Sequence, residues 1–158
     1  MNHQPGQTPR ILVEGRPAAQ ALVSGDPSHP HLMGEVLFYP FHLGSLILAR
    51  VTGLPGSGFF AFHIHEHGDC SDGGDVSFHL AGGHYNPDGR PHPDHAGDLP
   101  VLLSSEGQAY TIFYTGRFRP LDVIGRSVII HEKPDDYRSQ PAGDSGSRIA
   151  CGKIEAAE

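Results

Sequence analysis

Residues 62–70 read FHIHEHGDC and place three histidines at alternate positions, with apolar residues between the first two. Along an extended strand successive side chains point to opposite faces, so residues two apart share a face. This alternation predicts that Phe62 and Ile64 face a core. His63 and His65 would then lie together on the other face, an alignment that a helix does not give to residues two apart. The stretch therefore indicates a β-strand with two imidazoles placed to bind one metal ion.

The rest of the chain reads as a series of short strands. It has 158 residues, enough for a single domain, and its 21 glycines and 14 prolines divide it into short segments rich in β-branched and aromatic residues. No long helical period occurs. We therefore expect an all-β fold, an eight-stranded antiparallel Greek-key sandwich or barrel with two long functional loops. The expected strands are 19–25, 32–41, 45–54, 58–67, 99–105, 108–116, 125–133 and 147–154.

Two segments lack strand periodicity. Residues 68–98 hold few aliphatic side chains, and a segment of this length inside a compact domain is typical of a functional loop. A second loop, 134–147, is rich in Pro, Asp, Ser and Gly. Residues 1–18 are mostly polar, so we expect an N-terminal tail or edge strand there, followed by one domain over 19–158.

Charge and hydropathy limit the partners. The net charge is −7 with the histidines neutral, which disfavours nucleic acid because a nucleic-acid-binding face is basic. No apolar run is long enough for a membrane span. The first ten residues lack the apolar core of a signal peptide, so the chain as given is expected in the cytoplasm, or in the periplasm or outside the cell if a leader was removed. Cys70 and Cys151 are compatible with two reduced thiols or with two small buried side chains.

Histidines and one aspartate gather around the first long loop. The stretch HPDHAGD at 92–98 packs two imidazoles and the Asp98 carboxylate into seven residues. Zinc accepts these ligands, and imidazole also suits copper. Loops use His, Asp and Gly for turns as well, so this stretch alone leaves a structural turn open, whereas two clusters joined by one loop favour metal binding. The metal-capable residues are His63, His65, His84, His92, His95, Asp98 and His131.

Four stretches, taken in order, resemble the successive signatures of the copper–zinc superoxide dismutases. They are GFFAFHIHEHGDC at 58–70, AGGHYNPDGRPHPDHAGDLP at 81–100, IGRSVIIHEK at 124–133 and GSRIACGKI at 146–154. These motifs are long and specific, and the likeness covers most of the chain. We therefore expect the Greek-key fold, the metals copper and zinc, and the activity of that family.

The resemblance implies roles for individual residues. Arg148 matches the family's arginine beside the copper, and Asp135 matches the carboxylate that links a copper histidine to a zinc histidine. Cys70 and Cys151 match its intrasubunit disulfide. The implied copper ligands are His63, His65, His84 and His131. The implied zinc ligands are His84, His92, His95 and Asp98, with the His84 ring shared by both metals.

The implied reaction is the dismutation of superoxide to dioxygen and hydrogen peroxide. Copper would alternate between two oxidation states, while zinc, which has no redox chemistry, would act as a fixed charge and a clamp. His84 would be both ligand and acid, since in the family the shared ring leaves copper, takes a proton and passes it to the bound oxygen species. Arg148 is always cationic and would pair with the anionic substrate.

Other interpretations use the same residues. A dismutase-like domain that only stores or delivers metal is one alternative, but all seven ligand positions and Arg148 are filled, which favours the enzyme. A zinc hydrolase needs an open water position, which four protein ligands would not leave. Dimers are common in the family, so a homodimer is a further expectation. The loop 134–147 is shorter than in longer family members, and Lys133 is its only lysine neighbour. This difference bears on how strongly the charge around the site attracts superoxide. His67 and His79 receive no role.

Overall fold

The computed structural model describes residues 15–71 and 74–158, so residues 1–14 of the expected tail or edge strand lie outside the described part of the chain. The described residues form nine β-strands and two short 3-10 helices, η1 (His79–Ala81) and η2 (Pro120–Val123). The division into a tail and one domain stays a prediction. The strands are β1 (Ala19–Gly25), β2 (Met33–Phe41), β3 (Gly44–Thr52), β4 (Gly58–Phe60), β5 (Phe62–His65), β6 (Leu102–Ser105), β7 (Gln108–Thr115), β8 (Ser127–His131) and β9 (Arg148–Ala156).

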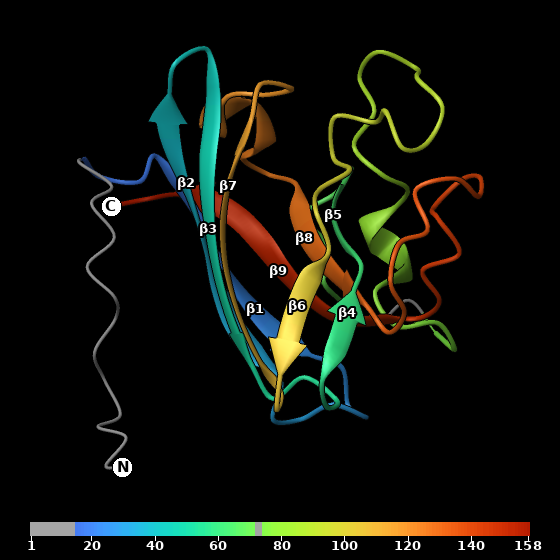
Figure 1. The fold of residues 1–158 in the computed structure, drawn as a ribbon. Helices are drawn as coiled ribbons and strands as arrows, with labels where there is room; N and C mark the ends of the chain where they lie inside the picture. Colours follow the sequence, from blue (N-terminus) through green and yellow to red (C-terminus); the bar gives the residue numbers. More distant parts are fainter. Residues whose placement is uncertain (1–14, 72–73) are drawn as a thin grey trace, which may run out of the picture.

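All the strand pairs are antiparallel, and the sheet curls into a nearly closed barrel (Figure 1). The strand order is β4-β6-β7-β3-β2-β1-β9-β8-β5, so its two end strands are consecutive in the chain. Ala61 separates them, and at this residue the segment changes partner from β6 to β8: the Ala61 N–H donates to Lys133 O at 2.8 Å and its carbonyl accepts the His131 N–H at 2.9 Å. The predicted all-β Greek-key class is confirmed, and the expected eight strands become nine because one of them divides here.

The alternation predicted for residues 62–65 is present, and both faces of this strand are buried. Phe62 and Ile64 enter the main hydrophobic core, as expected. His63 and His65 point to the other face, yet they are also buried, with only 0% and 1% of their surface exposed. This face is covered because the long loop packs against it.

The backbone of the long loop completes the open edge of β5. The Ile64 N–H donates to Gly97 O at 2.9 Å, and the Tyr85 N–H donates to Ile64 O at 2.8 Å. A Cβ atom at Gly97 would lie 2.3 Å from Ile64 O, so only glycine permits this approach. Figure 1 shows the loop and the orange-red segment 134–147 on the same side of the barrel. Together they enclose the histidines of β5.

A disulfide joins the start of the long loop to β9. Cys70 and Cys151, 81 positions apart, are bonded in the structure, which confirms the pairing implied by the family resemblance. Cys151 is buried with Phe78, Ala81 and Ile129 in a small apolar cluster against which Cys70 packs. The bond therefore ties the covering loop to the barrel wall. No helix in the described part of the chain has the length and apolar character needed to span a membrane.

Removing this disulfide should weaken the fold. In the chain-entropy model a loop of this length contributes up to about 4.5 kcal/mol. The double variant Cys70→Ala/Cys151→Ala should therefore lose up to about that much unfolding free energy, measured by urea denaturation of metal-free protein so that metal binding does not enter. Wild-type protein unfolded in the presence of a thiol reductant should show the same loss. An unchanged urea midpoint in both samples would contradict the stabilising role.

Candidate metal centre

Segments far apart in the sequence meet on the covered face of β5. β5 pairs with β8, and isolated bridges join His65 to His84 and His63 to Asp98. These contacts bring strand and loop histidines together in two buried groups whose donor atoms all lie within 4.8 Å of one another. The first group is His63, His65, His84 and His131. The second is His84, His92, His95 and Asp98. All seven sequence-predicted ligand residues are therefore present in two groups, and His84 belongs to both.

In two rings of the first group, His65 and His131, a hydrogen bond at Nδ1 determines which nitrogen is free to bind a metal. Nδ1–H of His65 donates to Gly82 O at 2.9 Å, and Nδ1–H of His131 donates to Gly146 O at 3.3 Å. Their Nε2 atoms then face each other at 3.4 Å. Donation from one ring nitrogen fixes the tautomer and leaves the other nitrogen with a lone pair for a metal.

Two buried nitrogens of the first group have no hydrogen-bond partner in the described part of the chain. They are Nδ1 of His63 and Nε2 of His84. A buried polar atom left without a partner costs about 1–3 kcal/mol. A metal ion between these two rings and the Nε2 atoms of His65 and His131 would satisfy both. The group thus fits an ion with four imidazole ligands, which is suitable for copper.

The second group has the spacing of a tetrahedral zinc site. Four ligands at about 2.0–2.1 Å from one ion lie about 3.3 Å from each other. The Nδ1 atoms of His84 and His95 are 3.2 Å apart, and Oδ2 of Asp98 lies 3.0 Å from Nδ1 of His92 and 3.2 Å from Nδ1 of His95. Three imidazoles and one carboxylate at these separations fit zinc with no open position.

His84 presents one nitrogen to each group. Its Nδ1 lies 2.7 Å from Oδ1 of Asp98, inside the second group. Its Nε2, on the other side of the same ring, is the unpartnered atom that faces the first group. The ring centroids of His84 and His63 are only 4.0 Å apart. One imidazole therefore belongs to both groups.

Asp135 links the two groups by accepting hydrogen bonds from one histidine of each, at the ring nitrogens that point away from the proposed metals. Its Oδ2 accepts from Nε2–H of His63 at 2.6 Å, and its Oδ1 accepts from Nε2–H of His92 at 2.8 Å. Burial alone would raise the pKa of this carboxyl, but the bonds from His63, the Tyr137 N–H and His92 outweigh burial and lower the pKa to about 2. The carboxylate stays ionised and holds both rings with their Nδ1 atoms toward the metal groups.

Burial also keeps His63, His65 and His131 of the first group neutral. It lowers the pKa of His63 to about 4 and that of His131 to about 3, and it places the pKa of His65 well below its usual value. A protonated imidazole cannot bind a metal ion. These three rings are therefore already in the protonation state that binds a metal ion.

Two side chains that the sequence analysis missed hold the backbone of the loop between the zinc-type ligands. The Gln140 amide pairs with the main chain of His92, accepting from its N–H at 2.9 Å and donating to its carbonyl at 2.6 Å. Nη1 of Arg117 donates to Pro93 O at 2.9 Å and to His95 O at 2.8 Å. Neither residue stands in a recognisable motif, so no sequence signal could have identified them.

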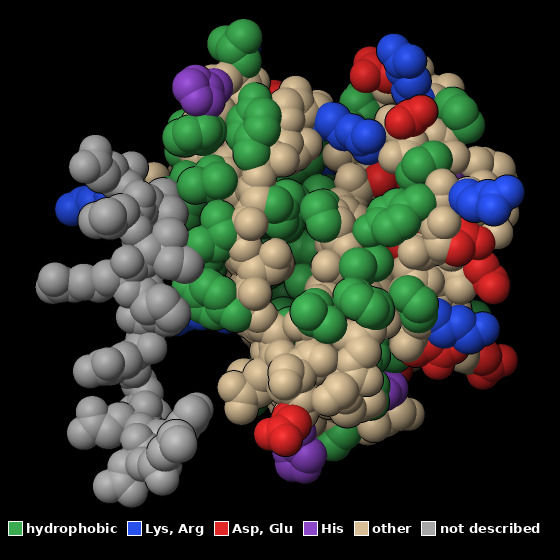
Figure 2. Space-filling model, in the orientation of Figure 1, with side chains coloured by type: hydrophobic (Ala, Val, Ile, Leu, Met, Phe, Trp, Pro, Cys, Tyr) green, Lys and Arg blue, Asp and Glu red, His purple; other side chains and the backbone are tan. Residues whose placement is uncertain are grey.

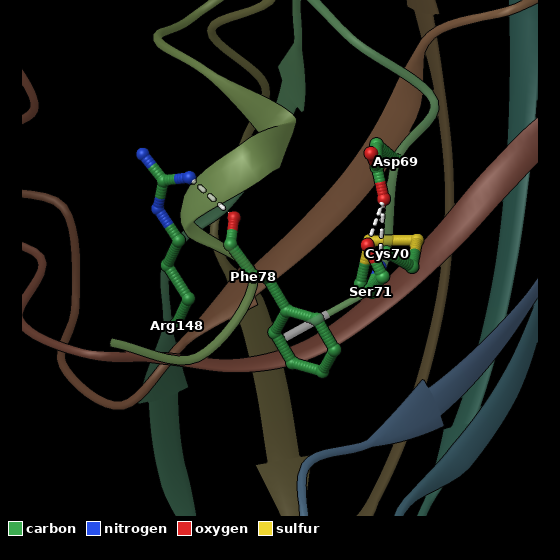
Figure 3. Close-up of a disulfide and its surroundings, with 6 residues drawn as sticks. Asp69, Cys70, Ser71, Phe78 and Arg148 are labelled. Atoms are coloured by element: carbon green, nitrogen blue, oxygen red, sulfur yellow. Dashed lines mark hydrogen bonds between the residues drawn. A yellow bond between two sulfur atoms is a disulfide. The ribbon is translucent and has the colours of Figure 1, made fainter. Parts of the chain in front are cut away.

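Arg148 lies beside the first group. Its Nη1 donates to Phe78 O at 2.8 Å (Figure 3). Its Nη2 donates to Gly82 O at 2.6 Å. Gly82 O also accepts from His65, so one carbonyl links the arginine to a metal-binding ring. The guanidinium contributes to the lowered pKa of both His65 and His131. A hollow of about 310 Å³ beside it is lined by Arg148, Glu132, Asp26 and Ser77, among others.

The remaining histidines lie elsewhere. His67 and His79 are exposed, and His67 lies beyond the end of β5, so it does not join the two metal groups. His29 contacts the Asp26 carboxylate at 2.7 Å in the turn after β1. The two metal groups and Arg148 are therefore the part of the histidine-rich chain that forms a site.

A barrel that carries a four-histidine group, a three-histidine and one-carboxylate group and a ring common to both defines a class of two-metal redox proteins. Comparison with known proteins identifies the class. Residues 33–154 match the family model Copper/zinc superoxide dismutase (SODC), and the chain belongs to this family. It is accordingly an oxidoreductase whose cofactors are copper and zinc.

Curated relatives support the assignment. A Superoxide dismutase [Cu-Zn] of Deinococcus radiodurans is 36% identical over 141 residues, covering 78% of this chain and 77% of the relative. Superoxide dismutase [Cu-Zn] 2 of Aquifex aeolicus is 34% identical over 146 residues, covering 78% and 79%. An Extracellular superoxide dismutase [Cu-Zn] of Caenorhabditis elegans is 40% identical over 124 residues, covering 68% of this chain and 54% of the relative.

Proposed function

We propose that the first group binds copper, that the second binds zinc, and that the protein uses them to dismutate superoxide. The observation that carries this proposal is His84, whose unpartnered Nε2 faces the first group while its Nδ1 lies among the second. The proposed copper ligands are His63, His65, His84 and His131. The proposed zinc ligands are His84, His92, His95 and Asp98.

When bound, copper supplies one-electron chemistry, by which one superoxide is oxidised to dioxygen and a second is reduced, with two protons, to hydrogen peroxide. The protein has to deliver at least one of these protons inside a buried site. Nε2 of His84 is the suitable atom, because Nδ1 of the same ring is engaged by the second group and the ring cannot turn away. His84 would carry a proton at Nε2 and donate it toward the copper side only while this nitrogen is not bound to copper, because one nitrogen cannot hold a proton and a metal at once.

Arg148 provides the positive charge that an anionic substrate requires. Its guanidinium is held by two carbonyls next to His65, at the edge of the first group. A protein that only carries metal has no use for a cation fixed in this place. Burial lowers the pKa of Arg148 from a very high starting value, and the side chain stays protonated at any physiological pH.

Asp135 supports both metal sites. By accepting from His63 and His92 it couples a ring of the copper group to a ring of the zinc group. A change of geometry in one site therefore reaches the other through one carboxylate.

We also propose a homodimer formed through the outer face of β4, β6 and β7. Phe59 and Leu103 face each other across β4 and β6 and are 54% and 61% exposed, and Tyr110 and Tyr114 of β7 are exposed beside them. Figure 2 shows hydrophobic side chains gathered over this face. Two copies of a chain with net charge −7 repel each other. An apolar face brings the fewest like charges together, so it is the most favourable surface for a dimer.

The disulfide bears on the compartment. Disulfides persist where the surroundings are oxidising and are rare in reducing cytosol. Of the two expected locations, we propose the oxidising one, the periplasm or the outside of the cell, because the Cys70–Cys151 bond ties down the loop that covers the metal site.

The two metal sites should be separable by mutation. His131→Ala removes a donor from the first group alone, so copper affinity should fall by more than the roughly 10–100-fold that loss of an outer hydrogen-bond partner costs, while zinc is retained. His95→Ala should show the reverse. Elemental analysis after equilibration in buffers of defined free metal measures both. If the two variants lose both metals equally, the partition of ligands is wrong.

Arg148 should control the reaction rate through its charge. Arg148→Glu should lower the rate constant about 10- to 1000-fold, because reversal of charge repels the anion. Arg148→Lys keeps the sign and should lose much less, with a rate that falls as salt rises. Superoxide decay after pulse radiolysis, on samples of known metal content, measures these rates. Equal rates for both variants and wild type would remove Arg148 from the reaction and favour a metal carrier.

The homodimer should depend on the apolar face. Leu103→Asp places two like charges opposite each other in a symmetric interface of the usual size, about 800 Å² on each partner, and should give monomers. Leu121→Asp, at an exposed leucine of η2 outside this face, is the matched control and should leave the dimer intact. Sedimentation equilibrium measures the assembly state. A wild-type monomer, or a dimer that survives Leu103→Asp, would contradict the proposed surface.

A further inference from the structure

Phe78 has an unusual backbone conformation beside Arg148. Its φ is +56° and its ψ is 28°, in the left-handed region that a bulky side chain rarely adopts. Such a conformation is costly and persists only where its surroundings impose it. In this conformation the Phe78 carbonyl points at the guanidinium and accepts from Nη1 of Arg148 at 2.8 Å.

The ring of Phe78 supplies one of the constraints. It is buried in the small cluster with Ala81, Ile129 and Cys151, against which Cys70 packs. Figure 3 shows the carbonyl facing Arg148 while the ring is turned away from it. The apolar contact therefore fixes one side of the residue and leaves the carbonyl on the other side for the arginine.

The residue before it supplies a second constraint. Oγ–H of Ser77 donates to Oδ2 of Asp26 at 3.0 Å. Asp26 is nearly buried, and its own N–H donates to Ile149 O at 2.9 Å. Because Ile149 follows Arg148 on β9, the contacts form a closed ring that runs from Arg148 through Phe78, Ser77 and Asp26 and returns to β9.

Asp26 is itself held in place. Its Oδ1 accepts from the Ser28 N–H at 3.0 Å and from Nδ1–H of His29 at 2.7 Å. The turn after β1 is thus built around this carboxylate, which leaves Oδ2 for Ser77. Asp26, Ser77 and Arg148 line the same hollow of about 310 Å³.

We propose that Phe78, supported by Ser77 and Asp26, is a positioning residue that fixes the guanidinium of Arg148 for binding an anion beside the copper group. A free arginine side chain loses rotamer entropy when it is fixed against an anion. Holding the guanidinium through the Phe78 and Gly82 carbonyls removes that loss before the substrate arrives. This inference rests on the proposed role of Arg148, and it adds that Phe78 acts only through that arginine.

The test uses Phe78→Ala, Ser77→Ala and Phe78→Leu, with Leu80→Ala as the matched control. Leu80 lies in the same 3-10 turn, but its side chain is 45% exposed. The probe is azide, whose binding to the copper-loaded protein is followed by its absorption band, together with the superoxide rate constant and its dependence on salt. Copper and zinc contents and the copper EPR spectrum are recorded for every sample.

Ser77→Ala removes one hydrogen bond of the ring and should weaken azide binding and lower the superoxide rate about fivefold, the equivalent of one such bond. Phe78→Ala should cause a larger loss, and Phe78→Leu, which keeps an apolar anchor, should restore part of it. The metal contents and the EPR spectrum should match wild type. Leu80→Ala should behave as wild type in every measurement.

A double variant shows whether the effect passes through Arg148. In an Arg148→Lys background, Ser77→Ala should cause no further loss, because the group that it positions is already gone. Additive losses, or wild-type azide affinity and rate in Ser77→Ala and Phe78→Ala, would overturn the proposal, as would loss of metal together with activity. If Arg148→Lys and Arg148→Glu alone leave the rate unchanged, the proposed function of Arg148 fails instead, so the two failures can be told apart.

Discussion

The Asp135 carboxylate is the contact on which the arrangement of the site depends. It lies in the loop 134–147, yet it accepts from His63 on β5 and from His92 in the other long loop. Two loops and one strand therefore meet at one ionised group, whose pKa of about 2 keeps it charged. Because each accepted proton leaves a lone pair on the opposite ring nitrogen, the carboxylate determines where metal ligands can form as well as how the loops are fixed.

Burial of six histidine rings in a metal-ready form also imposes a requirement on the fold. Burial disfavours the charged form of an imidazole, and the low pKa values of His63 and His131 show this effect. Each ring then has one nitrogen that donates and one that is left over. In His63, His65, His92 and His131 the donating nitrogen meets a carbonyl or the Asp135 carboxylate, and the remaining nitrogen belongs to one of the two groups. Bound metal would satisfy atoms such as Nε2 of His84 that the protein alone leaves unpartnered.

Period-two alternation was sufficient to predict most of the strands, and the resemblance to a known family, carried by contiguous motifs, implied the disulfide and the residues that the structure gathers in the two groups. The sequence could not predict contacts made by the backbone. The change of partner at Ala61 is made by its backbone N–H and carbonyl. Gln140 holds the main chain of His92 through its amide, and Phe78 offers a carbonyl to Arg148. Any residue type has these backbone groups, so no side-chain pattern marks them.

Backbone carbonyls also determine the position of the Arg148 side chain. The chain has a net charge of −7, so an anion is attracted only by positive charge concentrated near the site. A cation fixed beside the two histidine groups gives a stronger field there than a mobile one. The guanidinium has five N–H donors, and the two carbonyls use two of them. Donors remain for an anion, while the carbonyls stop the side chain from swinging into solvent. The strained backbone at Phe78 is the local cost of this arrangement, and the Phe78 ring is held in the buried cluster with Cys151.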